Sequence, residues 1–314
     1  MEADAGPVTG EVSLQGEVSP LVVSASRATD IPAFYGRWFV NRLRAGHCLW
    51  RNPYNLGQIQ RVRFDNCKVA VFWTKDASPF LQHLPEIEAA FPSYFQYTLN
   101  DYESEGFEPG VPALEDRIAT FVELSGRLGR ERVVWRFDPL LLTRELTPER
   151  LLDRVDRLGR RLCRHTDRLV ISFVDDYHKM RRRIAALPDP PRTFTSGEMT
   201  AFARGLLGRV AAWPRPIALA SCCEAGDLCG IPANRCVDPE LAGRIAGTPI
   251  PDGLRPTRPD CRCGASKDIG AYSTCPHGCV YCYANQGAAV VASRHRRHDP
   301  EAEMLDPGPE PSGN

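Results

Sequence analysis

Residues 133–175 read VVWRFDPLLLTRELTPERLLDRVDRLGRRLCRHTDRLVISFVD. The apolar runs at 133–138 and 168–175 predict two buried strands. Between them, Thr147 followed by Pro148 is typical of a helix start, and the amphipathic pattern predicts a helix over 147–163. Two strands joined by a helix pair in parallel, so this stretch indicates one βα repeat of a parallel sheet.

The same alternation extends outward in both directions along the chain. Further strands are predicted at 21–26, 69–75, 94–99 and 216–222, with helices near 32–45, 79–90, 113–129, 176–187 and 196–212. Six βα units are too few for a closed eight-stranded barrel, so we expect an α/β fold with an open or partial barrel. The expected divisions are a flexible arm over 1–20, the barrel over 21–222, a cysteine-rich segment over 223–293 and a flexible tail over 294–314.

Composition narrows the class of protein. The chain has 314 residues and a formal net charge of zero, so no overall basic field favours nucleic acid. No apolar run approaches the roughly 20 residues of a membrane span, and the acidic N-terminus does not resemble a signal peptide. We therefore expect a cytoplasmic protein, in which the twelve cysteines are metal ligands or core residues rather than disulfides.

Near the C-terminus, Cys275, Cys279 and Cys282 form a C-x3-C-x2-C run. Three thiolates can hold three irons of a [4Fe–4S] cluster and leave the fourth iron open to a small molecule. This run, with Tyr281 before its last cysteine, resembles the signature of radical S-adenosylmethionine (SAM) enzymes. The resemblance implies a partial (β/α)6 TIM-like barrel, with SAM bound to the open iron and Tyr281 against its adenine. In that superfamily the triplet usually follows the first strand, whereas here it follows the last predicted strand.

A second set of cysteines precedes the triplet. Cys222, Cys236, Cys261 and Cys263 would suffice for a second iron–sulfur cluster, and four thiolates would also suit zinc. Cys223 and Cys229 compete for these ligand positions.

Polar residues follow several predicted strands, where the carboxyl ends of a parallel barrel place the chemistry. Arg27, Lys75, Arg136 and Asp138 are therefore predicted to line a catalytic pocket. Asp268, Tyr272 and Asn285 flank the triplet and are candidates for orienting SAM, although capping and turn roles fit the Asp and Asn equally well. His277, inside the triplet, is expected to hydrogen-bond rather than to ligate metal.

Several longer elements resemble a single prokaryotic family of unknown function, over roughly residues 20–300. They are SASRATDIPAFY, RNPYN, VFWTK, YFQYTL, VVWRFDPLLL, ISFVD and DIGAYSTCPHGCVYCYAN. The resemblance implies an iron–sulfur enzyme of partial-barrel type and supports ligand roles for the second set of cysteines. The family pattern usually has a small residue at the position of Cys223.

The expected function is therefore radical SAM chemistry, in which a 5′-deoxyadenosyl radical takes hydrogen from a small-molecule substrate. An auxiliary cluster would serve redox transfer or sulfur insertion, for example into a sugar or nucleoside. An external donor of flavodoxin or ferredoxin type would supply electrons. Two alternatives remain, a zinc-binding structural or nucleic-acid-binding module and an electron carrier that does not bind SAM.

Overall fold

The computed structural model describes residues 14–174, 181–185, 187–224, 227–306 and 308. Its main sheet has seven parallel strands in the order β10-β2-β5-β6-β7-β8-β9. Their bounds are β2 Val22–Ala25, β5 Val69–Thr74, β6 Ser93–Thr98, β7 Val133–Leu140, β8 Arg168–Phe173, β9 Ala218–Ser221 and β10 Lys267–Asp268. The predicted parallel α/β fold is confirmed, and within the described residues the edge strands β9 and β10 do not pair, so the sheet is open. Residue 175, expected at the end of β8, lies outside the described residues.

Helices follow the strands where the sequence predicts them. They are α1 Ile31–Phe34, α2 Gly36–Ala45, α3 Leu84–Ala90, α4 Leu114–Leu128, α5 Pro148–Leu162, α6 Arg181–Ala185 and α7 Ser196–Ala211. The helix expected over 32–45 divides at Tyr35, and the one expected over 79–90 begins as a separate 3-10 turn at Ser78–Phe80. Of the helix expected over 176–187, only the part that includes α6 is described. None of the helices in the described ranges is both long and apolar enough to cross a membrane.

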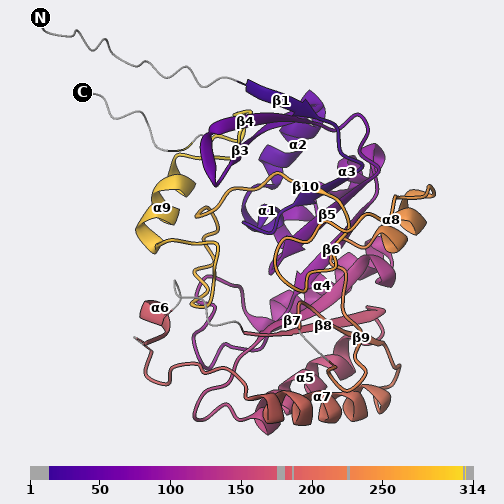
Figure 1. Ribbon diagram of the computed structural model, residues 1–314, viewed down its shortest axis with the longest axis vertical. Helices are drawn as coiled ribbons and strands as arrows, with labels where there is room; N and C mark the ends of the chain where they lie inside the picture. The colour runs from indigo at the N-terminus through magenta and orange to yellow at the C-terminus, as the bar shows by residue number, and fades with distance from the viewer. Residues whose placement is uncertain (1–13, 175–180, 186, 225–226, 307, 309–314) are drawn as a thin grey trace, which may run out of the picture.

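The two faces of the sheet have different partners. One face contributes large apolar side chains, such as Phe72 and Trp135, to a core shared with the surrounding helices. The other face alternates Val71, Tyr94 and Val170 with polar residues and packs against a smaller core. That core includes residues of the cysteine-rich segment and of its helix α8 (Pro239–Ala246). Figure 1 shows this segment in orange, where it passes across the sheet. Because each successive strand from β2 to β9 lies beside its predecessor, the crossover helices gather on one face and leave the other to the cysteine-rich segment.

Several regions differ from the sequence-based expectations. Both α8 and β10 lie in the segment 223–293, in which no helix or strand was predicted. A second sheet, in the order β1-β4-β3, comprises β1 Leu14–Val18, β3 His47–Asn52 and β4 Asn55–Arg63, so part of the arm expected over 1–20 is a strand. The helix α9 (Ala288–Arg296) runs into the expected tail. Beyond α9, Leu305 is buried, and Trp38 Nε1 donates a hydrogen bond to the carbonyl of Ala302. The described residues of the tail therefore pack against α2 and β3, beside which Figure 1 shows α9 in yellow.

Candidate functional site

The loop Cys275–Cys282, which we call the triplet loop, is held by the segment that follows β6. Gly110 N donates to the carbonyl of His277 at 2.8 Å, and Val280 N donates to the carbonyl of Phe107 at 3.0 Å. A Cβ atom on Gly110 would lie 2.8 Å from the carbonyl oxygens of both Pro276 and His277. This close backbone approach requires glycine at position 110.

A buried carboxylate anchors the triplet loop from the other side. Asp30 caps α1 by accepting from Ala33 N at 3.0 Å, and its second oxygen accepts from Lys75 N at 2.7 Å and from His277 Nε2 at 2.8 Å. The Nδ1 atom of His277 lies 3.1 Å from the carbonyl of Gly110. Both ring nitrogens are therefore engaged by protein oxygens, in agreement with the expected hydrogen-bonding role.

Lys75, Glu108 and Tyr281 form a buried network beneath the loop. Lys75 Nζ donates to Glu108 at 2.7 Å and to the Tyr281 hydroxyl at 2.9 Å, while that hydroxyl donates to Glu108. Burial would raise the pKa of Glu108, but Lys75 and Arg117 outweigh it and hold this pKa at about 2. Glu108 is therefore a carboxylate at neutral pH, and it fixes the positions of Lys75 and Tyr281.

Burial and neighbouring charges raise the pKa values of two thiols of the triplet. Burial raises the pKa of Cys279 to about 12; Lys75 opposes this rise and Cys282 adds to it. The pKa of Cys275 is raised by burial and by the charges of Asp30, Cys279 and Cys282. Thiols in this environment become thiolates when a metal binds them, since metal binding releases the proton.

Two further residues predicted around the triplet lie at its border. Asn285 Nδ2 donates to the carbonyl of Cys275 at 2.8 Å, whereas its buried Oδ1 has no hydrogen-bond partner among the described residues. Tyr272 lies farther out, where burial and the hydroxyl of Tyr54 raise its pKa to about 12. Of the two, Asn285 is the one with an unused acceptor next to the loop.

Five other thiols form a continuous chain, which we call the second cysteine group: Cys222, Cys223, Cys236, Cys261 and Cys263. The Sγ atom of Cys222 lies 3.6 Å from that of Cys236 and 3.8 Å from that of Cys223. Cys236 is also the main cause that lowers the pKa of Cys263 to about 7, and the neighbouring Cys261 raises that pKa. The structure thus brings together the four cysteines predicted for a second centre and adds Cys223. Cys229 is separate, and its thiol donates to the carbonyl of Thr200 at 3.5 Å.

Arg136 and Asp138 of β7 lie beside the second cysteine group. Arg136 donates through Nε and Nη2 to Asp138 and through Nη1 to the Sγ atom of Cys236 at 3.1 Å. Asp138 also accepts from the hydroxyl of Ser172. Every nitrogen of the Arg136 guanidinium therefore has a partner within the protein.

Arg27 and Asp268 also lie on this side of the site. Asp268 in β10 accepts from Ser24 Oγ at 2.8 Å, Ser26 Oγ at 2.7 Å and Arg27 N at 2.9 Å. The guanidinium of Arg27 lies 4.7 Å from the ring centre of Trp73 and donates to Ser24 Oγ at 3.1 Å. Burial would lower the pKa of Arg27, but Asp268 and Cys263 outweigh burial and raise it. The predicted residues thus form two sets. Lys75, Tyr281 and Asn285 lie at the triplet. The set near the second cysteine group comprises Arg27, Arg136, Asp138 and Asp268, and Tyr272 belongs to neither set.

Asn100, which the sequence analysis missed, connects the two sets. Its Nδ2 donates to Glu108 at 2.9 Å and to the Tyr281 hydroxyl at 3.2 Å, and its Oδ1 accepts from Asp138 N at 2.9 Å. The predicted strand ends at residue 99, and Asn100 is the polar residue directly after it. The rule that functional side chains follow strand ends could therefore have identified Asn100 as a candidate site residue.

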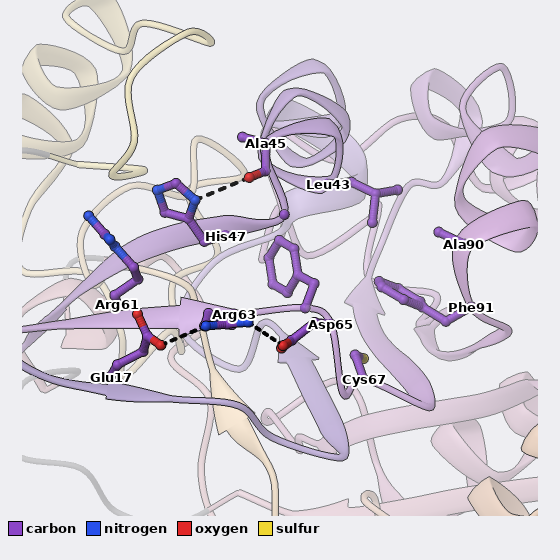
Figure 2. Close-up of a pocket in the computed structure, with 12 residues that line it drawn as sticks. Glu17, Leu43, Ala45, His47, Arg61, Arg63, Asp65, Cys67, Ala90 and Phe91 are labelled. Atoms are coloured by element: carbon purple, nitrogen blue, oxygen red, sulfur yellow. Dashed lines mark hydrogen bonds and ion pairs between the residues drawn. The ribbon is translucent and has the colours of Figure 1, made fainter.

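A separate cavity of about 580 Å³ lies among β1, β3, β4 and the helix α2 (Figure 2). Phe64 and Phe91 line it, as does Arg63, which pairs with Glu17 and Asp65. None of the cysteines between 222 and 282 lines it, so it is not part of the thiol-rich site.

The donor chemistry of both thiol groups fits a metal centre. No set of three or more His, Cys, Asp or Glu side chains in the described ranges is arranged to hold a single metal ion. Yet the ligand atoms are all sulfur, which selects iron–sulfur clusters, zinc or copper(I) rather than magnesium or calcium. The unpartnered Oδ1 of Asn285 further offers an acceptor to a ligand of the triplet.

Comparisons with known proteins assign the family but no activity. No curated protein matches the chain significantly. The same is true of solved structures. Residues 22–284 match the family model described as "Domain of unknown function (DUF1848)", and the chain therefore belongs to this family.

Proposed function

We propose that this chain is a radical SAM enzyme whose cluster is held by Cys275, Cys279 and Cys282. The observation that carries the proposal is the way in which the triplet loop is anchored. Its backbone, His277 and Tyr281 make the contacts with the β-strand ends, and no sulfur of the triplet hydrogen-bonds to another side chain within the described residues. The loop is thus fixed while its three thiols stay available to a metal cluster.

The partial (β/α)6 barrel belongs to the same proposal. Strands β2 to β9 follow one another in chain order, as in a barrel, and the triplet loop lies against segments that follow β2, β5 and β6. Catalytic groups of parallel barrels lie at these carboxyl ends.

The bound cluster and SAM would together supply a 5′-deoxyadenosyl radical that removes hydrogen from a small-molecule substrate. The protein's own part is positioning. Glu108 and Lys75 hold Tyr281 by its hydroxyl, and Lys75 Nζ also lies 5.4 Å from the centre of its buried ring, so the position of this aromatic residue is fixed. Asn285 offers its free Oδ1 to a donor group of the cofactor.

We further propose that the second cysteine group holds an auxiliary iron–sulfur cluster, with four ligands drawn from its five thiols. This cluster would serve redox transfer, or it would give up sulfide to a product such as a sugar or nucleoside. An external donor of flavodoxin or ferredoxin type would reduce the triplet cluster.

Four thiolates are also a usual ligand set for structural zinc. A zinc-binding structural role is therefore the second candidate for this group.

Metal analysis of four chains tests the proposal. Iron, acid-labile sulfide and zinc are measured after anaerobic reconstitution of the wild type, of a triplet variant (Cys275, Cys279 and Cys282→Ala), of a second-group variant (Cys222, Cys236, Cys261 and Cys263→Ala) and of C229A. We expect about eight irons in the wild type and in C229A, and about four in each of the other two. SAM cleavage by the reduced wild type completes the test.

The alternatives give different results. Four irons that disappear only in the triplet variant, with one zinc that disappears only in the second-group variant, would assign zinc to the second group. Protein that holds zinc alone in all four chains would contradict radical SAM chemistry.

A further inference from the structure

We propose that Arg136 and Asn234 set the reduction potential of the centre in the second cysteine group by donating hydrogen bonds to the sulfur of Cys236. The inference rests on the proposed auxiliary iron–sulfur cluster. In this inference the two side chains adjust the reduction potential of the centre and do not contact a substrate.

Both donors are buried and aimed at the same atom. Arg136 is 4% exposed, and its Nη1 lies 3.1 Å from Cys236 Sγ. Asn234 is 5% exposed, and its Nδ2 lies 3.3 Å from the same sulfur. Sulfur acceptors form long hydrogen bonds, so both distances describe real contacts.

The orientation of the Arg136 guanidinium is fixed by its other partners. Asp138 binds Nε and Nη2, and Gln96 Oε1 accepts from Nη1 at 3.2 Å. The backbone of Cys236 is fixed as well, because its carbonyl accepts from Tyr94 at 2.8 Å and from Gln96 Nε2 at 3.0 Å. The N–H groups therefore keep their direction toward the sulfur without reorganisation.

Such hydrogen bonds act on the redox equilibrium. Reduction adds one electron to the cluster, and N–H dipoles directed at a ligand sulfur stabilise the more negative, reduced state. The positive charge of Arg136 acts in the same direction in a buried site, although Asp138 offsets part of it. Arg27 and Arg258, whose charges act on Cys263 and Cys223, add further positive charge around the group.

Tyr94 supplies a matched control. Its hydroxyl donates to the carbonyl of Cys236 and accepts from Asp238 N at 3.1 Å, so it supports the same residue without touching the sulfur. The substitution Tyr94→Phe removes this support and leaves both N–H···S contacts in place.

The test is a redox titration followed by electron paramagnetic resonance. It uses the full chain with the triplet replaced by alanine, so that the remaining iron belongs to the second group. R136Q is expected to shift the reduction equilibrium about tenfold toward the oxidised form, which is 59 mV for a one-electron couple. N234A is expected to shift it in the same direction by less, and Y94F to leave it unchanged.

Unchanged potentials in R136Q and N234A with iron retained would overturn the inference, and so would an equal shift in Y94F. If R136Q loses its iron, N234A decides, because it removes one donor and no charge. A parent chain without iron would overturn both this inference and the auxiliary cluster. A shift in R136Q together with a wild type that cannot cleave SAM would uphold the inference and contradict only the radical SAM proposal.

Discussion

Asp30 and His277 are 247 positions apart in the chain, yet the carboxylate of Asp30 accepts a hydrogen bond from Nε2 of His277 at 2.8 Å. The same carboxylate caps α1 and accepts from the backbone of Lys75 at the end of β5. One buried side chain thus joins the first helix, the second parallel strand and the triplet loop.

Replacing Asp30 with asparagine tests this junction. Asparagine has one acceptor oxygen where aspartate has two. Asp30→Asn therefore leaves at least one donor unpaired, and we expect it to lower the free energy of unfolding by about 3 kcal/mol. Urea unfolding measures the change. Asp153→Asn is the control, because Asp153 forms an exposed ion pair with Arg209 and its loss should have an effect below about 1 kcal/mol. Equal losses in the two variants would contradict the junction.

A methyl group at position 110 should displace the triplet loop. Gly110→Ala would place its Cβ 2.8 Å from two backbone oxygens, which cannot both move without moving the loop. We expect less iron at the triplet after reconstitution, with the iron of the second group retained. Gly126→Ala in α4 meets no atom within 4 Å and should instead stabilise the chain by about 1 kcal/mol. Full iron content in the Gly110 variant would show that the loop tolerates the displacement.

The carboxylate of Asp156 should make stability depend on pH. Burial would raise its pKa, but Trp213, which donates to it at 2.7 Å, and Arg160 and Arg209 outweigh burial and lower it. A lowered native pKa gives stability that is present above the unfolded value of about 3.9 and is lost as the pH falls below it. The difference in unfolding free energy between wild type and Asp156→Asn should therefore be largest near pH 7 and shrink below about pH 4. A difference that stays constant with pH would rule out this linkage.

Asn100→Asp probes the connection between the two thiol groups. The new carboxylate oxygen would replace the amide nitrogen that now faces Glu108 and the carbonyl of Asp138. Like charges in a buried site repel, so we expect destabilisation of about 3 kcal/mol at pH 7. Asn66→Asp, at an exposed position, should change stability by less than about 0.5 kcal/mol. Matching values for the two variants would mean that Asn100 is not constrained by Glu108.

Six of the seven strands of the main sheet could be predicted, because they are short apolar runs that alternate with helices, whereas the two-residue strand β10 is not apolar and was missed. Thr147 and Pro148 begin α5 as expected, and Thr147 accepts from Arg150 N. The β3–β4 hairpin was missed because few of its residues are buried: Cys48 is the one in β3, and Ile59 and Val62 are those in β4. With so few inward side chains, the period-two pattern is too weak to recognise.

The sequence indicated where residues of the candidate site lie, at the ends of strands, but it did not indicate which residues they contact. The rule that chemistry lies at strand ends singled out Lys75 and Arg136, and in the structure each of them has a charged neighbour. It could not reveal that Lys75 pairs with Glu108, or that Arg136 faces Cys236. These contacts join segments up to 100 positions apart, and their geometry depends on the strand register, which the local sequence does not encode.

The position of β10 has a consequence for the order in which the protein is made and matures. The last strand of the main sheet pairs with the first, and Asp268 binds Ser24 across 244 positions. During synthesis the edge of β2 therefore stays without this neighbour until residues 267 and 268 have been made, and pairing over such a separation is slow. The triplet loop follows β10 directly, so its docking waits for the same event. Under the proposed function, iron and sulfide should accordingly be delivered to the triplet only after β10 has paired with β2.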